Sequence, residues 1–83
     1  MPVLRLDELD DGESAEIIGY DEETPPNLKM RFVGMGLTRG VVVKRVRRSV
    51  LGDPIEFRVR GYCVSLRRCE ARYIKVRKLG GEK

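Results

Sequence analysis

The segment from Leu28 to Gly40 constrains the fold of this chain more than any other stretch. It begins with apolar residues at helical spacing, carries three glycines, and passes directly into the β-branched run 41–43. We expect Gly36 to end the helix in the left-handed conformation, which glycine adopts without steric cost. A helix that stops on glycine and turns straight into a strand fixes the chain direction, so the flanking segments must be arranged around that corner.

The start of this helix is predicted from two neighbouring residues. Thr24 is a typical N-cap residue, and Pro25 would then occupy the first helical position, where the missing N–H of proline does no harm. We expect Lys29 and Arg39 to point outward. The buried stripe is predicted at three positions with helical spacing: Leu28, Phe32 and Met35.

The rest of the chain has the pattern of short strands. The leucines at 6 and 9 suggest a short lead-in that plugs one end of the core, and residues 67–71 suggest a single helical turn before the last strand. Together these features predict a mainly β fold, a small, partly open five-stranded barrel with one inserted α-helix. We expect a single domain over residues 1–79 and a flexible tail over residues 80–83. The expected strands are residues 14–20, 41–47, 55–60, 62–66 and 73–76.

One predicted strand has an imperfect alternation. In residues 41–47, Val41 and Val43 share a face with Arg45, whereas the strand 55–60 alternates cleanly with apolar residues inward. Val42 and Val46 share the other face with Lys44, so each face carries a basic residue and the pattern leaves the inward face of this strand undecided.

The charges are divided unevenly along the chain. Residues 1–24 carry nine acidic side chains and one basic one, whereas residues 25–83 carry sixteen basic and four acidic ones, for a net charge of +4. The basic part could attract nucleic acid, an anionic lipid surface or an acidic protein. Alternatively, the acidic segment could fold back over the basic one and cancel part of its field. The sequence leaves both possibilities open.

The sequence argues against catalysis and against a metal centre. The chain has no histidine, so its serines and its two cysteines lack the commonest general base. Cys63 and Cys69 fit no metal-knuckle spacing, and we expect them to be buried or half-buried thiols. The glycines precede a strand, the reverse of the order in dinucleotide-binding loops. We therefore predict no catalytic, cofactor-binding or metal-binding residues. Without a long apolar run, we expect a cytoplasmic protein that is not embedded in a membrane.

Four motifs, in order, give the chain a family resemblance over residues 4 to 77. The chain resembles the FeoA family of small ferrous iron transport proteins, whose fold is an SH3-like barrel with an added helix. One departure is Arg45, which stands where the family usually has an aliphatic residue. The motifs are Leu6-x-x-Leu9-x-x-Gly12, Arg31-Phe32-x-x-Met35-Gly36-Leu37-x-x-Gly40, Leu51-Gly52-Asp53-Pro54, and Gly61 with Leu66-Arg67-x-x-Glu70-Ala71-x-x-Ile74-x-Val76.

The resemblance implies an accessory protein of iron homeostasis rather than an enzyme. Its implied partner is FeoB, the membrane ferrous iron permease with a GTPase domain, which it would bind and modulate through protein–protein contacts. We expect no small-molecule substrate, at most weak self-association, and no iron site in this chain, although transition metal binding is associated with the family's role. The alternatives are a small basic barrel that binds nucleic acid, and a stand-alone relative of the SH3-like domain of DtxR-type metal-dependent regulators. The expected partner surface is Met35, Leu37, Arg39, Leu51 and Asp53.

Overall fold

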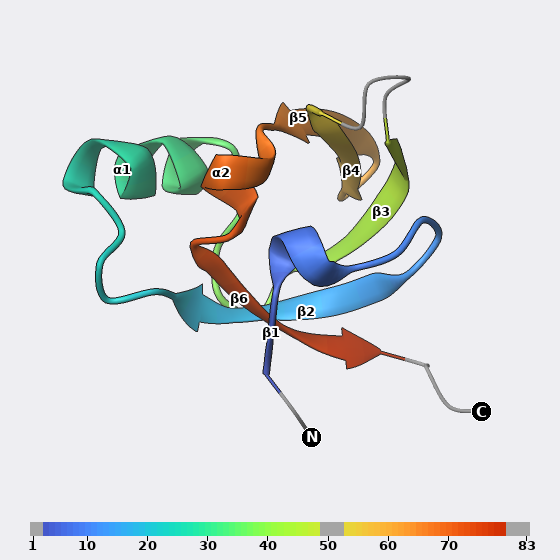
Figure 1. The fold of residues 1–83 in the computed structure, drawn as a ribbon, viewed down its shortest axis with the longest axis horizontal. Helices are drawn as coiled ribbons and strands as arrows, with labels where there is room; N and C mark the ends of the chain where they lie inside the picture. The colour runs from blue at the N-terminus through green and yellow to red at the C-terminus, as the bar shows by residue number, and fades with distance from the viewer. Residues whose placement is uncertain (1–2, 49–52, 80–83) are drawn as a thin grey trace.

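Six short strands form one curled antiparallel sheet, with a helix at one end (Figure 1). The computed structural model describes residues 3–48 and 53–79. Along the sheet the strand order is β1-β6-β2-β3-β4-β5. The elements in chain order are β1 (Leu4–Arg5), the 3-10 helix η1 (Leu6–Glu8), β2 (Ser14–Tyr20), α1 (Pro26–Gly34), β3 (Val42–Arg48), β4 (Ile55–Val59), β5 (Tyr62–Leu66), α2 (Arg68–Ala71) and β6 (Ile74–Leu79).

The predicted mainly β fold with one inserted helix is confirmed, with one strand more than expected. The additional strand, β1, is two residues long and pairs with β6 through Leu4 opposite Val76. The short helical turn before the last strand is present as α2. Leu51 and the expected flexible tail over residues 80–83 lie outside the described residues. None of the described helices is long and apolar enough to cross a bilayer.

The core is aliphatic and lies inside the curl of the sheet. Leu6 and Leu9 are fully buried, so the leucines of the lead-in belong to the core. Strand β4 buries every second residue, as its alternation predicts. Two phenylalanines supply the largest side chains, Phe32 from α1 and Phe57 from β4. Packing therefore ties the helix to the sheet through Phe32 and its neighbours.

The helix begins one residue later than the sequence suggested, so Thr24 is not its N-cap. Pro25 occupies the cap position with an extended backbone (ψ 140°), and Pro26 is the first helical residue. A proline disfavours the helical conformation in the residue before it, so the second of two prolines sets the start. The Thr24 hydroxyl instead donates to the carbonyl of Asp21 at 2.6 Å.

The end of the helix is where the sequence placed it. Gly36 has φ 82°, and its amide donates to the carbonyl of Val33 at 3.0 Å. A Cβ at this position would lie 2.5 Å from the Tyr62 hydroxyl. Both the backbone conformation and the available space therefore require glycine.

Replacing Gly36 with alanine is expected to lower the free energy of unfolding by about 1–3 kcal/mol, since it adds left-handed strain and a contact with Tyr62. Gly34→Ala is the matched control, because a Cβ there meets nothing within 4 Å. Alanine is the better helix former by up to about 1 kcal/mol, so the control should be neutral or stabilising. Urea unfolding of both variants measures the difference, and equal stabilities would contradict the requirement for glycine at position 36.

Arg45 points into the core on the same face of β3 as Val43, which settles the inward face that the sequence left undecided. Its side chain is 5% exposed, and its guanidinium donates a hydrogen bond to the carbonyl of Leu9. Its Nε lies 3.1 Å from Oδ1 of Asp11, an ion pair that is not aligned as a hydrogen bond. The Arg45 amide also donates to the carbonyl of Glu13 at 2.9 Å. Arg45 thus joins β3 to the turn that precedes β2.

Candidate partner surface

The end of α1 and the start of β5 meet at one exposed shoulder of the molecule. The Tyr62 hydroxyl donates to the carbonyl of Met35 at 2.6 Å, and the Tyr62 side chain is itself exposed. Met35 is half-buried and packs against the core. This hydrogen bond holds the edge strand β5 against the C-terminal end of the helix.

The five expected surface residues are not gathered at this shoulder. Arg39 is exposed in the turn that follows the helix, whereas Leu37 is fully buried in the core, so its side chain offers no surface to a partner. Leu51 lies outside the described residues. Asp53 is exposed, and its Oδ1 accepts a hydrogen bond from the amide of Arg68 at 2.8 Å, which places it beside α2. Met35 and Arg39 therefore remain as candidates at the helix end, and Asp53 lies at a different place.

Two exposed apolar residues of α1 were missed from the sequence. Met30 is 75% exposed and Val33 is 53% exposed. Both lie off the stripe formed by Leu28, Phe32 and Met35, because they follow Leu28 by two and five residues rather than by four and seven. Their positions off the stripe could have predicted, from helical spacing alone, that both side chains are exposed.

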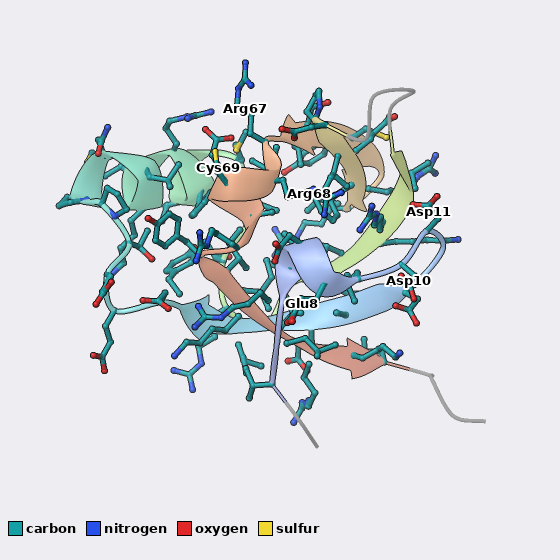
Figure 2. All side chains as sticks on the ribbon, in the orientation of Figure 1. Glu8, Asp10, Asp11, Arg67, Arg68 and Cys69 are labelled. Carbon is teal, nitrogen blue, oxygen red and sulfur yellow. The ribbon has the colours of Figure 1, made fainter. Side chains whose placement is uncertain are left out.

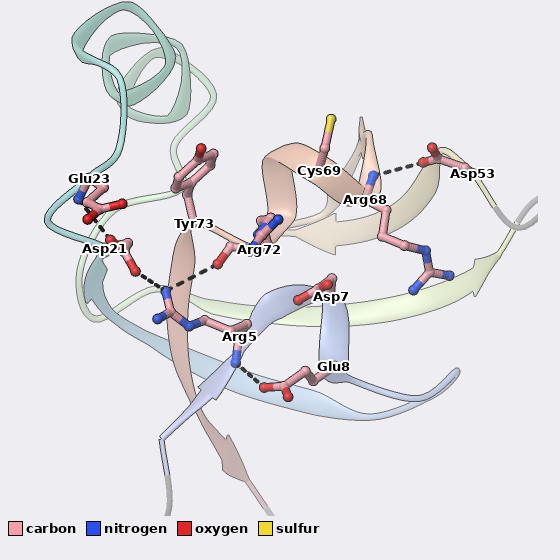
Figure 3. Close-up of a pocket in the computed structure, with 10 residues that line it drawn as sticks. All are labelled: Arg5, Asp7, Glu8, Asp21, Glu23, Asp53, Arg68, Cys69, Arg72 and Tyr73. Atoms are coloured by element: carbon pink, nitrogen blue, oxygen red, sulfur yellow. Dashed lines mark hydrogen bonds and ion pairs between the residues drawn. The ribbon is translucent and has the colours of Figure 1, made fainter.

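Beside α2 lies a polar hollow of about 650 Å³, shown in Figure 3. Five carboxylates and three arginines line it, together with Cys69 and Tyr73. Arg5 crosses it, with Nη1 2.5 Å from Oδ2 of Asp21 and 3.3 Å from the carbonyl of Arg72. Among the described residues, Oδ1 of Asp7 is buried with no hydrogen-bond partner. Several of these charges are satisfied internally, since Glu8, Asp21 and Asp53 each accept a hydrogen bond from an arginine amide or guanidinium.

Local hydrogen bonds shift the pKa of several side chains. The Lys78 ammonium and the Asp10 amide lower the pKa of Glu13, while the Glu23 amide and the Arg5 guanidinium lower the pKa of Asp21. Burial raises the pKa of Tyr20. The shifts of the two acids arise from hydrogen-bond partners and that of Tyr20 from burial, so all three are explained by the fold.

The acidic N-terminal segment folds back over part of the basic remainder. Figure 2 labels Glu8, Asp10 and Asp11 around η1 and the turn before β2, and Arg67 and Arg68 around α2. Ion pairs cross between the two parts of the chain: Asp11 with Arg45, Glu16 with Arg77, and Glu13 with Lys78. Part of the basic field is therefore cancelled, and the rest is left on other faces.

Both cysteines are exposed and free, so the expectation of buried thiols was wrong. Cys63 lies opposite Arg58, which is exposed on β4, and Cys69 lies on the short helix α2 beside the polar hollow. The expectation rested on the general tendency of cysteine to be buried, and that tendency does not apply at these two positions. Within residues 3–48 and 53–79, no three cysteine or acidic side chains are grouped as a metal site would need.

A comparison with models of known protein families identifies the family of this chain. The model of the FeoA domain matches residues 4–78. The chain belongs to the FeoA family. FeoA proteins are non-catalytic accessory proteins of ferrous iron transport, so the expectation that this chain is not an enzyme is confirmed.

Known relatives agree with this assignment. A fusion of Fe(2+) transport protein A with the Fe(2+) transporter FeoB, from Porphyromonas gingivalis, is 34% identical over 73 residues, which is 88% of this chain and 8% of that protein. The chain therefore spans only a small part of this curated relative. The solution structure of a FeoA-like protein from Clostridium acetobutylicum is 30% identical and superposes with a TM-score of 0.87, covering 100% of this chain and 94% of the other.

A crystal structure confirms the SH3-like class. FeoA of Stenotrophomonas maltophilia, determined with zinc and described as a prokaryotic SH3-domain protein, is 26% identical with a TM-score of 0.78, and 89% of each chain is covered. The barrel of this chain is therefore SH3-like, as the family resemblance implied.

Proposed function

We propose that this chain is a small cytoplasmic accessory protein of ferrous iron uptake, which binds a FeoB-type transporter and modulates it through protein–protein contacts. The observation that carries the proposal is the Porphyromonas gingivalis relative, in which a matching segment and a FeoB transporter are parts of one protein. Fusion holds two domains at a high effective concentration, which is useful when they act together. In this chain the same association would form between separate proteins.

We place the contact on the shoulder formed by α1 and β5. Met30 and Val33 supply exposed apolar side chains on α1, Met35 and Tyr62 are joined by a hydrogen bond at the end of this helix, and Arg39 is exposed in the turn that follows. Protein interfaces are enriched in methionine, tyrosine and arginine, with an apolar centre and a polar rim. Asp53 would contribute only with a partner large enough to reach α2 as well.

The test is a binding titration with the soluble GTPase domain of the FeoB protein from the same organism. The double variant M30S/V33S is expected to weaken binding at least tenfold, because central apolar contacts carry much of the energy of an interface. Both side chains are exposed, so the stability of the fold should change by less than about 1 kcal/mol.

The matched control is V3S/L79S, which removes two exposed apolar side chains at the opposite ends of the chain, 55% and 37% exposed. This variant should bind within about twofold of the unaltered protein. Absence of binding by the unaltered chain would contradict the proposed partner. Equal losses in both double variants would contradict the proposed surface.

A further inference from the structure

The outer face of strands β3, β4 and β5 carries an uncompensated basic pair. Lys44 of β3 lies directly opposite Arg58 of β4, and Cys63 of β5 lies opposite Arg58 on its other side. All three residues are exposed. Arg60, at the end of the same hairpin, is exposed as well and has φ 49°. Like charges directly opposite one another destabilise a sheet, so this pair weakens the fold.

No acidic side chain in the described part of the chain forms an ion pair with Lys44 or Arg58. Glu16, on the neighbouring strand β2, is already 2.7 Å from Nη2 of Arg77. Glu56 is the nearest acid along the same strand, two residues before Arg58 on the same face. Its single negative charge does not offset the three positive charges of Lys44, Arg58 and Arg60, so the net charge of the face is positive. The remaining charge is thus available to an anion outside the chain.

An exposed aliphatic residue accompanies these cations. Val42 is 49% exposed and lies two residues before Lys44, on the same side of β3. Basic side chains around a small exposed apolar side chain match the boundary of an anionic bilayer, where headgroup charges lie just above the acyl chains.

We propose that the outer face of β3, β4 and β5 rests on the anionic headgroups of a membrane surface. The basic face, defined by Lys44, Arg58, Arg60 and Val42, would supply a weak, reversible attachment. Single-stranded nucleic acid fits this face less well, because stacking needs aromatic side chains, and Tyr62, which precedes Cys63 in β5, belongs to the opposite face of the sheet. The attachment needs no contact with a transporter, so it extends the proposed function without depending on it.

The proposal is tested by co-sedimentation of the purified chain with lipid vesicles. At low ionic strength the chain should bind vesicles that contain phosphatidylglycerol and should not bind vesicles of phosphatidylcholine alone. The variant K44S/R58S should lower the partition coefficient roughly 30-fold, since each basic residue near an anionic surface contributes about fivefold. Added salt should weaken the binding of the unaltered chain.

A matched variant, R72S/K75S, removes the same charge from the residue that follows α2 and from β6, which is not adjacent to β3, β4 or β5 in the sheet. It should reduce binding far less than K44S/R58S does. Equal losses in the two variants would show a response to net charge alone and would overturn the proposal. Failure of the unaltered chain to bind phosphatidylglycerol vesicles would also overturn it. So would tighter binding to an oligonucleotide that K44S/R58S abolishes, because nucleic acid would then be the occupant.

Stability separates a binding role from a structural one. The charge reversal R58E should raise the midpoint of urea unfolding, because it places opposite charges across the β3–β4 pair, yet it should weaken vesicle binding about as much as K44S/R58S does, since it changes the charge by the same two units. A variant that is more stable and binds more weakly cannot owe its loss to unfolding. These vesicles contain no transporter, so the experiment does not test the contact with FeoB. A negative result would therefore leave the proposed partner unaffected.

Discussion

Replacing Arg45 with alanine is expected to lower the free energy of unfolding by about 2–4 kcal/mol, with a fall in melting temperature of more than about 10 °C. The side chain is 5% exposed, so its removal leaves a void in the core. It also leaves the carbonyl of Leu9 without the donor supplied by the Arg45 guanidinium. The charge left behind on Asp11 is not costly, because that side chain is 47% exposed. Urea and thermal unfolding measure both quantities.

Arg45→Met separates packing from hydrogen bonding at this position, and Arg77→Ala is the control on the surface. Arg45→Met refills most of the volume, so its loss should be only about 1–2 kcal/mol, from the unpaired carbonyl. Arg77→Ala removes an arginine that is 49% exposed and paired with Glu16, and such surface pairs contribute less than about 1 kcal/mol. If the alanine variants at 45 and 77 were equally stable, Arg45 would not join β3 to the turn before β2.

That Arg45 shares a face with Val43 was accessible from sequence because it follows from a local rule, although which face points inward was not. Successive residues of a strand point to opposite faces, so the burial of Val43 fixes the side of Arg45 whatever its charge. The glycine at position 36 is similar, since a left-handed backbone is a property of the residue itself. Features that depend on one residue and its immediate neighbours could therefore be predicted.

Features assembled from distant segments could not be predicted. Strand β1 exists only because Leu4 meets Val76, and two residues carry no periodicity. The polar hollow brings together η1, α2 and Asp53, which no spacing connects. In the turn after Gly36 the apolar residues follow neither helical nor strand spacing. Buried Leu37 and exposed Arg39 were therefore assigned to the same surface. Of the five expected surface residues, Leu37 was lost for that reason.

Tyr20 is expected to determine how firmly the helix, and with it the proposed partner surface, is held. Its ring stacks on Phe32 with centroids 5.7 Å apart, and its hydroxyl donates to the carbonyl of Leu37 at 2.5 Å. The Lys29 Nζ lies over the same ring, 5.9 Å from its centroid. One side chain of β2 thus contacts both the helix and the segment that follows it.

Tyr20→Ala should therefore destabilise the fold by about 2–4 kcal/mol, because it removes a partly buried ring and a hydrogen bond. Tyr20→Phe keeps the ring and should lose only about 1 kcal/mol. Lys29→Ala removes the cation above the ring and should lose about 0.5 kcal/mol. This graded order, measured by urea unfolding, distinguishes stacking from hydrogen bonding as the main anchor of α1.

The same series tests whether the helix position matters for binding. At temperatures where Tyr20→Ala is still folded, faster amide exchange confined to α1 is expected, because the helix loses its aromatic contact with the sheet. Binding to the FeoB GTPase domain should then weaken at least tenfold for Tyr20→Ala and by less than about threefold for Tyr20→Phe. Equal effects of the two variants on exchange and binding would show that the hydroxyl, and not the ring, positions the helix. Full binding by the alanine variant would instead move the partner surface away from α1.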